Sequence, residues 1–142
     1  MEAKTISKYS KKTVQQLLKL ATRHFNTYIR QRDSEDGFGR CISSGRPLVV
    51  PSQNAQAGHY YSAGKYPLLR FDEDNVHLQS KSDNYYMSGN LLEYRKNLIK
   101  KIGLEKVERL DRIAEMSKGR AHKWDRFHLI EIIDKYKHKN RK

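Results

Sequence analysis

The sequence predicts an α+β fold in which a small, irregular β segment lies between helical flanks. Helical spacing of apolar residues in the first forty residues and again after residue 84 indicates the flanks. Between them, short β-prone runs alternate with turn residues. Charge divides the chain at the same places: net +5 over 1–40, −1 over 41–94 and +9 over 95–142. We expect a basic N-terminal helix, a central segment and a basic helical C-terminal part within one compact domain.

The N-terminal helix is expected to begin at Ser10 or Thr13, either of which could cap it. No pattern precedes it in residues 1–9, and "DSEDGFG" at 33–39 indicates its end and a turn. The apolar stripe consists of Val14, Leu17, Leu18, Ala21, Phe25, Tyr28 and Ile29. The cations on the opposite face, which include Arg30 and Arg32, fit a solvated surface and phosphate contact equally well.

The central segment is expected to form an irregular β-hairpin followed by a long loop. In "CISSGRPLVVP", at 41–51, two β-prone pieces surround a Ser-Gly turn. A polar loop at 52–58 precedes another short run that starts at His59. This segment has little apolar content, so it needs the flanking helices or a bound metal to fold.

Two or three helices should follow. One stripe extends from Leu91 to Ile102 and is broken by Gly103. A second short stripe begins at Leu104, and Asp125 is placed to cap a last helix with a basic end.

Composition limits the function classes. A net charge of +13 and a pI of about 9.9 favour a polyanionic partner. Basic flanks around a neutral centre suit a nuclease better than a nucleic-acid coat, although they also fit solvated helix faces. The single cysteine, Cys41, excludes an intramolecular disulfide, and no apolar run resembles a signal or a membrane span. We therefore expect a cytoplasmic protein without membrane contact.

The centre holds a candidate constellation of His59, Asn75, His77 and Asn84. Histidine, then asparagine, then histidine or asparagine is the order of the HNH, or ββα-metal, nuclease motif. His59 would be the general base, Asn75 would fix its loop, and Asn84 would ligate a divalent cation such as Mg²⁺ or Mn²⁺. Spacing alone is weak support, because a lone loop histidine is more often a surface residue.

The wording around these residues is more specific. The stretches "RCISSGRP", "AGHYYSAGKYPLLRFDEDNVHLQ" and "SGNLLEYRKNLIKKIGLEKVERL" resemble the phage NinG (Rap) recombination endonuclease family, as do "FNTYIRQRD" and "LIEIIDKYK". The resemblance implies a metal-dependent endonuclease acting on branched double-stranded DNA, such as Holliday junctions or D-loops. It places the protein in the bacterial host, at the nucleoid.

The family pattern also carries two Cys-x-x-Cys knuckles that bind a structural zinc. Here the corresponding positions are Cys41 with Ser44 and Ser80 with Asp83. Neutral hydroxyls are weak zinc ligands, so we predict no structural zinc and expect hydrogen bonds to join the knuckles. A residual site of Cys41, Asp83 and a histidine is the alternative.

Other site assignments stay open. Gly58 stands where many HNH nucleases carry a second metal ligand, so His77 or an acid such as Asp74 would assist Asn84. Arg70 could clamp the scissile phosphate or pair with Asp72 or Asp74. Tyrosines around the centre could stack on bases or belong to the core. The candidate DNA-binding residues are Arg30, Arg32, Arg95, Lys96, Lys100 and Lys101.

Three functions compete: an active junction endonuclease, an inactive branched-DNA-binding protein of the same fold, and an RNA-binding protein. Symmetric cutting of a junction needs two active sites, which favours a homodimer, although the sequence contains no dimer signature.

Overall fold

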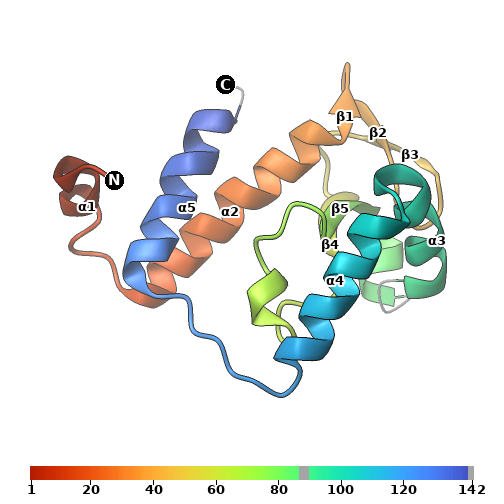
Figure 1. Cartoon of the computed structure of the whole chain (residues 1–142). Coiled ribbons are helices and arrows are strands. Elements are labelled where there is room, and N and C mark those ends of the chain that lie inside the picture. Colours follow the sequence, from red (N-terminus) through yellow and green to blue (C-terminus); the bar gives the residue numbers. More distant parts are fainter. Residues whose placement is uncertain (87–89, 141–142) are drawn as a thin grey trace. The chain divides into compact units, whose positions relative to one another are not determined.

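The computed structural model describes residues 1–86 and 90–140, and it confirms a mixed α+β fold with an N-terminal helix and C-terminal helices (Figure 1). The chain divides into two compact units, one formed by residues 1–28 and 123–142 and the other by residues 29–122. These borders differ from those that charge and pattern suggested at residues 40 and 94. Within the described residues, no helix is long and apolar enough to cross a membrane.

The first unit is helical and contains α1 (Ala3–Lys8), most of α2 (Val14–Arg32) and α5 (Arg126–Lys139). Residues 1–9, where no pattern was seen, hold the short helix α1. Thr13 caps α2: its hydroxyl accepts from the Gln16 amide at 3.1 Å, and the Gln16 side chain accepts from the Thr13 amide at 2.9 Å. Asp125 caps α5 at 2.9 Å, as expected.

The second unit contains two small antiparallel sheets. The first joins β1 (Ser34–Glu35), β2 (Phe38–Arg40) and β3 (Pro47–Val49) in that order. The second is a ribbon of β4 (Ala55–His59) and β5 (Val76–Ser80). Three expectations need correction. The turn expected at 33–39 holds β1 and β2, the hairpin uses β2 rather than 41–44 as its first strand, and β4 ends at His59 instead of starting there.

The remaining elements of the second unit are the 3-10 helix η1 (Pro67–Leu69), the π-helix η2 (Ser82–Tyr86), α3 (Leu91–Ile102) and α4 (Leu104–Ser117). Gly103 separates α3 from α4 with a φ of 93°, which confirms the predicted break. These helices supply most of the core cluster around Leu69, Tyr94, Leu98 and Leu110. Tyr94 donates from its hydroxyl to the Gly58 carbonyl at 2.6 Å, so α3 is anchored to β4 one residue before His59.

Candidate active site

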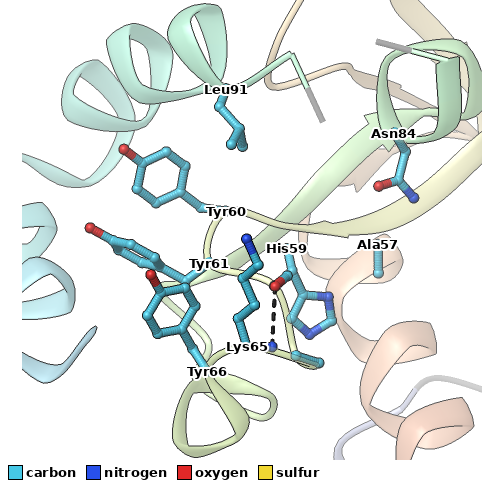
Figure 2. Close-up of a pocket in the computed structure, with 10 residues that line it drawn as sticks. Ala57, His59, Tyr60, Tyr61, Lys65, Tyr66, Asn84 and Leu91 are labelled. Carbon is cyan, nitrogen blue, oxygen red and sulfur yellow. Dashed lines mark hydrogen bonds between the residues drawn. The ribbon is translucent and has the colours of Figure 1, made fainter. Parts of the chain in front are cut away.

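His59 lies at the end of β4 and lines a cavity of about 550 Å³, which Figure 2 shows. Its Nε2 is 2.9 Å from the Arg70 carbonyl oxygen. A carbonyl only accepts, so Nε2 carries the proton and Nδ1 is left as an acceptor. Nδ1 makes no hydrogen bond to any residue that the structure describes. Burial lowers the pKa of His59, so the ring is neutral at neutral pH and its Nδ1 lone pair is free of a proton.

Asn75 closes the loop that connects β4 to β5. It is fully buried, and its Oδ1 accepts from the Tyr61 amide at 2.9 Å. Its Nδ2 donates to the carbonyls of Tyr61 at 2.9 Å and Leu69 at 3.0 Å. Arg70, whose carbonyl orients His59, directly follows Leu69. Asn75 therefore fixes the backbone that sets the direction of the His59 ring.

Asn84, on η2, lines the same cavity as His59. Its Nδ2 donates to Gln56 Oε1 at 2.9 Å, so the amide oxygen remains as a possible ligand. Of the expected metal ligands, Asn84 is the one that the structure brings to the cavity of His59.

His77 points away from this cavity. Gly58 is opposite His77 in the β4–β5 ladder and His59 is opposite Val76, so the two histidines project from opposite faces of the ribbon. His77 is 1% exposed, and its Nε2 donates to the Asp74 carbonyl at 2.8 Å. Its Nδ1 lies 2.8 Å from Lys101 Nζ and 3.0 Å from an Arg32 guanidinium nitrogen. Both ring nitrogens are thus engaged by the protein.

The expected metal ligands do not gather at one point. The Asp74 carboxylate accepts from Arg109 at 3.2 Å. This partner differs from that of the Asn84 side chain, which bonds Gln56, and from those of the His77 ring. Within residues 1–86 and 90–140, no group of three His, Cys, Asp or Glu side chains could hold a metal. A Cβ at Gly58 would lie 1.9 Å from Gln79 Oε1, so this position has no room for a ligating side chain.

This donor set fits a divalent cation only in part. Of the expected metal ligands, Asn84 offers one neutral amide oxygen to the cavity that His59 lines. Mg²⁺ keeps several waters and is commonly held through few protein ligands together with substrate phosphates. Cation binding at this cavity would therefore depend on phosphate oxygens of the substrate.

Arg70 is available to an anion. Its alternative partners, Asp72 and Asp74, are paired with Arg109 at 2.8 and 3.2 Å. Among the described residues, the Arg70 guanidinium has no hydrogen bond or ion pair of its own. Its charge contributes, after burial, to the lowered pKa of His59.

The four degenerate knuckle positions are joined by hydrogen bonds. Asp83 Oδ2 accepts from Ser80 Oγ at 2.6 Å and from Cys41 Sγ at 3.3 Å, and Asn90 donates to Oδ1 at 2.8 Å. Burial alone would raise the pKa of Asp83, but these bonds and one from Ser44 lower it. One thiol, one carboxylate and two hydroxyls that satisfy one another do not fit a tetrahedral zinc site.

The expected DNA-binding cations divide into two groups. Arg32 and Lys101 pair with the Asp33 carboxylate at 2.8 and 2.9 Å, and Arg95 pairs with Asp111 at 2.9 Å. Lys96 and Lys100 are exposed on α3, while Arg30 is half-buried. The exposed lysines of α3 remain the better candidates for phosphate contact.

Sequence interpretation missed part of the cavity wall. Lys65 and Tyr66 line it together with Ser62 and Ala63. Lys65 and Tyr66 follow Gly64 in a loop that Asn75 holds through hydrogen bonds. No sequence spacing indicates that this loop lines the same cavity as His59.

The fold and the site define a small mixed α+β protein in which a histidine, oriented by a fixed loop, lines a cavity. The chain matches the family model described as Bacteriophage Lambda NinG protein over residues 2–142, so it belongs to the NinG family. It is 39% identical over 107 residues to Protein ninG of Enterobacteria phage H19B, covering 75% of this chain and 48% of that protein. It is 37% identical over 122 residues to Protein ninG of Escherichia phage 933W, covering 86% and 55%.

Protein ninG of Escherichia phage lambda is 37% identical over 107 residues, covering 75% of this chain and 47% of that protein. The chain thus spans about half the length of the curated relatives that it matches. No solved structure matches it.

Proposed function

We propose that this chain is a divalent-metal-dependent endonuclease that cuts branched DNA in phage recombination. The observation that carries the proposal is the state of His59: a neutral ring, with Nε2–H held by the Arg70 carbonyl and Nδ1 open to a cavity shared with Asn84. Membership of a phage protein family supports the biological setting.

The chain's own residues suggest the chemistry. His59 Nδ1 accepts the proton of a water molecule that attacks phosphorus. Asn75 donates to the Leu69 carbonyl, which fixes the backbone next to the Arg70 carbonyl and thereby keeps the His59 ring in its orientation. The Arg70 guanidinium stabilises the negative charge that develops on the phosphate oxygens. A bound Mg²⁺ or Mn²⁺ at Asn84 would supply further charge stabilisation for the phosphate and the leaving oxygen.

The test is cleavage of a four-way junction and of a linear duplex with Mg²⁺ or Mn²⁺. We expect His59→Ala to lower the cleavage rate by about 100-fold or more, since a general base contributes roughly 10²–10⁴-fold. His138→Ala, an exposed histidine on α5, is the matched control and should cleave at the wild-type rate. The pH–rate profile should fall only below the ordinary histidine pKa, because the pKa of His59 is lowered.

The described residues that line the cavity include no carboxylate, which favours one alternative, a branched-DNA-binding protein without catalysis. Tight junction binding with no cleavage across metals and pH values would establish that alternative. Equal affinity for junction and linear duplex would contradict the preference for branched DNA. Symmetric cutting would require two chains on one junction, so we expect a dimer on the DNA.

A further inference from the structure

One wall of the His59 cavity consists of three tyrosine rings. Tyr60, Tyr61 and Tyr66 come from the loop after β4 and are half-buried. Ring centroids are 4.9 Å apart for Tyr60 and Tyr61 and 4.9 Å apart for Tyr61 and Tyr66, with interplanar angles of 71° and 69°. Figure 2 shows these rings on one side of the cavity and His59 on the other, with the Lys65 chain between them.

Hydrogen bonds to residues of α3 and α4 hold two of these rings in place. Tyr61 donates from its hydroxyl to Asp111 at 2.5 Å, and Arg95 donates to the Tyr60 hydroxyl at 3.0 Å. Arg95 and Asp111 pair with each other at 2.9 Å. Burial, together with the Asp111 carboxylate, raises the pKa of Tyr61 above its ordinary value, so its hydroxyl stays a donor. A ring held this way loses little further freedom when a flat ligand stacks on it.

The cavity has the size and charge for a nucleotide. About 550 Å³ falls within the usual range of small-ligand pockets. Lys65 is exposed and lines the cavity, and none of the described lining residues is acidic. Aromatic faces bind bases of any sequence, whereas a base inside a duplex has both faces covered by its neighbours. The wall therefore discriminates between unpaired and paired nucleotides, not between sequences.

We propose that Tyr60, Tyr61 and Tyr66 receive an unpaired nucleobase beside the phosphate that His59 acts on, so that the substrate class is DNA with an unstacked nucleotide at the cleavage site. Lys65 contacts the phosphate of that nucleotide. The inference rests on the proposed function for the presence of DNA at the cavity. It goes further by naming the feature of branched DNA that is recognised. That feature is an unpaired base, not the shape of the branch point.

The probe is a duplex with 2-aminopurine in a single-nucleotide bulge, compared with the same base fully paired, in EDTA so that no cleavage occurs. Binding of wild-type protein should lower the fluorescence of the bulged probe, since the base stacks on tyrosine. Tyr66→Leu should weaken binding of the bulged duplex by about 5- to 100-fold, the loss that corresponds to one base–aromatic stack. Tyr66→Phe, which keeps the ring, should bind like the wild type, and all three proteins should bind the paired duplex within about twofold of one another.

Unchanged wild-type fluorescence, or equal loss of both DNAs in Tyr66→Leu, would overturn the inference. The fluorescence result requires no variant, so a Tyr66→Leu chain that fails to fold cannot obscure it. Stacking without cleavage in Mg²⁺ or Mn²⁺ would reject the nuclease and support the base site. Failure to bind any DNA would overturn both.

Discussion

His77 shows how a residue can fit a sequence motif and still do something else. It lies between Lys101 and Arg32, which both contact Asp33, with the Tyr94 ring centroid 6.2 Å away. Burial first, and then the charges of Lys101 and Arg32, lower the pKa of His77 to about 3. Hydrogen bonds from Arg32 and Lys101 meanwhile overcome burial and lower the pKa of Asp33. A neutral histidine therefore accepts from the cations that neutralise Asp33.

The free energy of unfolding should consequently fall as the pH is lowered from about 6.5 toward 3. In this window the unfolded chain protonates His77 and the folded chain does not, which costs about 1.4 kcal/mol per pH unit. Above about pH 6.5, His77 is neutral in both the folded and the unfolded chain, so its protonation no longer lowers the free energy of unfolding. Urea unfolding at pH 7, 6, 5 and 4 measures the slope.

His77→Gln is the comparison. It loses some stability at pH 7, since the cations lose an acceptor, but its pH dependence should be shallower by about one proton. The titration of His59, on the other face of the ribbon, is common to both proteins and cancels in the difference. Parallel pH dependences would show that His77 is already protonated in the folded state.

The sequence predicted that His59, Asn75 and Asn84 belong to one centre because their order fits the motif and the stretches around them resemble the family. It could not assign His77, Arg32 or Lys101. Those assignments depend on the β4–β5 register, where a shift by one residue exchanges the two faces of a strand. Charge alone does not reveal whether an arginine faces solvent or a buried carboxylate.

At the scale of elements, two turns are joined by the cluster of Cys41, Ser80, Asp83 and Asn90. Asp83 Oδ2 accepts from Ser80 and Cys41, and the Ser80 amide donates to Cys41 Sγ at 3.2 Å. The cluster ties the turn after β2 to the end of β5 and the start of α3. The cluster thus joins, through hydrogen bonds, the positions for which the resemblance implied zinc ligands.

Asp83→Ala should lower the free energy of unfolding by about 2–3 kcal/mol, because it removes a charged acceptor and leaves buried donors unpaired. Thermal unfolding should be unchanged by EDTA, and elemental analysis of protein purified without chelator should find no stoichiometric zinc. Glu108→Ala, at an exposed position on α4, is the control and should stay within about 0.5 kcal/mol of the wild type. A chelator-dependent melting temperature, or about one zinc per chain, would refute this account.

Helices were more predictable than strands for a physical reason. Thr13, Gly103 and Asp125 mark helix ends through local chemistry that is visible in the sequence. The strands β1 and β2 are two and three residues long, and β2 and β4 contain glycine, so the β propensity of these segments is low. They form because partner strands supply the hydrogen bonds, and the pairing of β2 with β3 and of β4 with β5 joins residues too far apart to leave a local pattern.

For the whole molecule, positive charge is unequally divided between the compact units. Residues 1–28 and 123–142 contain thirteen Lys/Arg and four Asp/Glu, a net +9. Residues 29–122 contain sixteen and twelve, a net +4, although they include the His59 cavity. Several cations of the second unit are also paired with its own carboxylates, as Arg95 is with Asp111. This division suggests that the helical unit supplies general affinity for DNA and the other unit supplies selectivity.

The triple change Lys11→Gln, Lys12→Gln and Lys19→Gln tests that division, since all three lysines are exposed in the helical unit. It should weaken binding to junction, bulged and paired DNA by the same factor. The slope of log K against log salt should become shallower by up to about 2.7, because each phosphate contact contributes about 0.9. Binding isotherms between 50 and 200 mM salt, roughly the range in which such losses are large, provide the slope.

The matched control replaces the same three lysines by arginine, which keeps the charge and should keep the slope. The complementary comparison is Tyr66→Leu, which should change the preference for bulged over paired DNA while leaving the salt slope unchanged, since it removes no cation. If the lysine changes instead altered the preference, the helical unit would take part in recognising the substrate. General affinity and selectivity would then share one surface, and the unpaired base would no longer be sufficient to explain a preference for branched DNA.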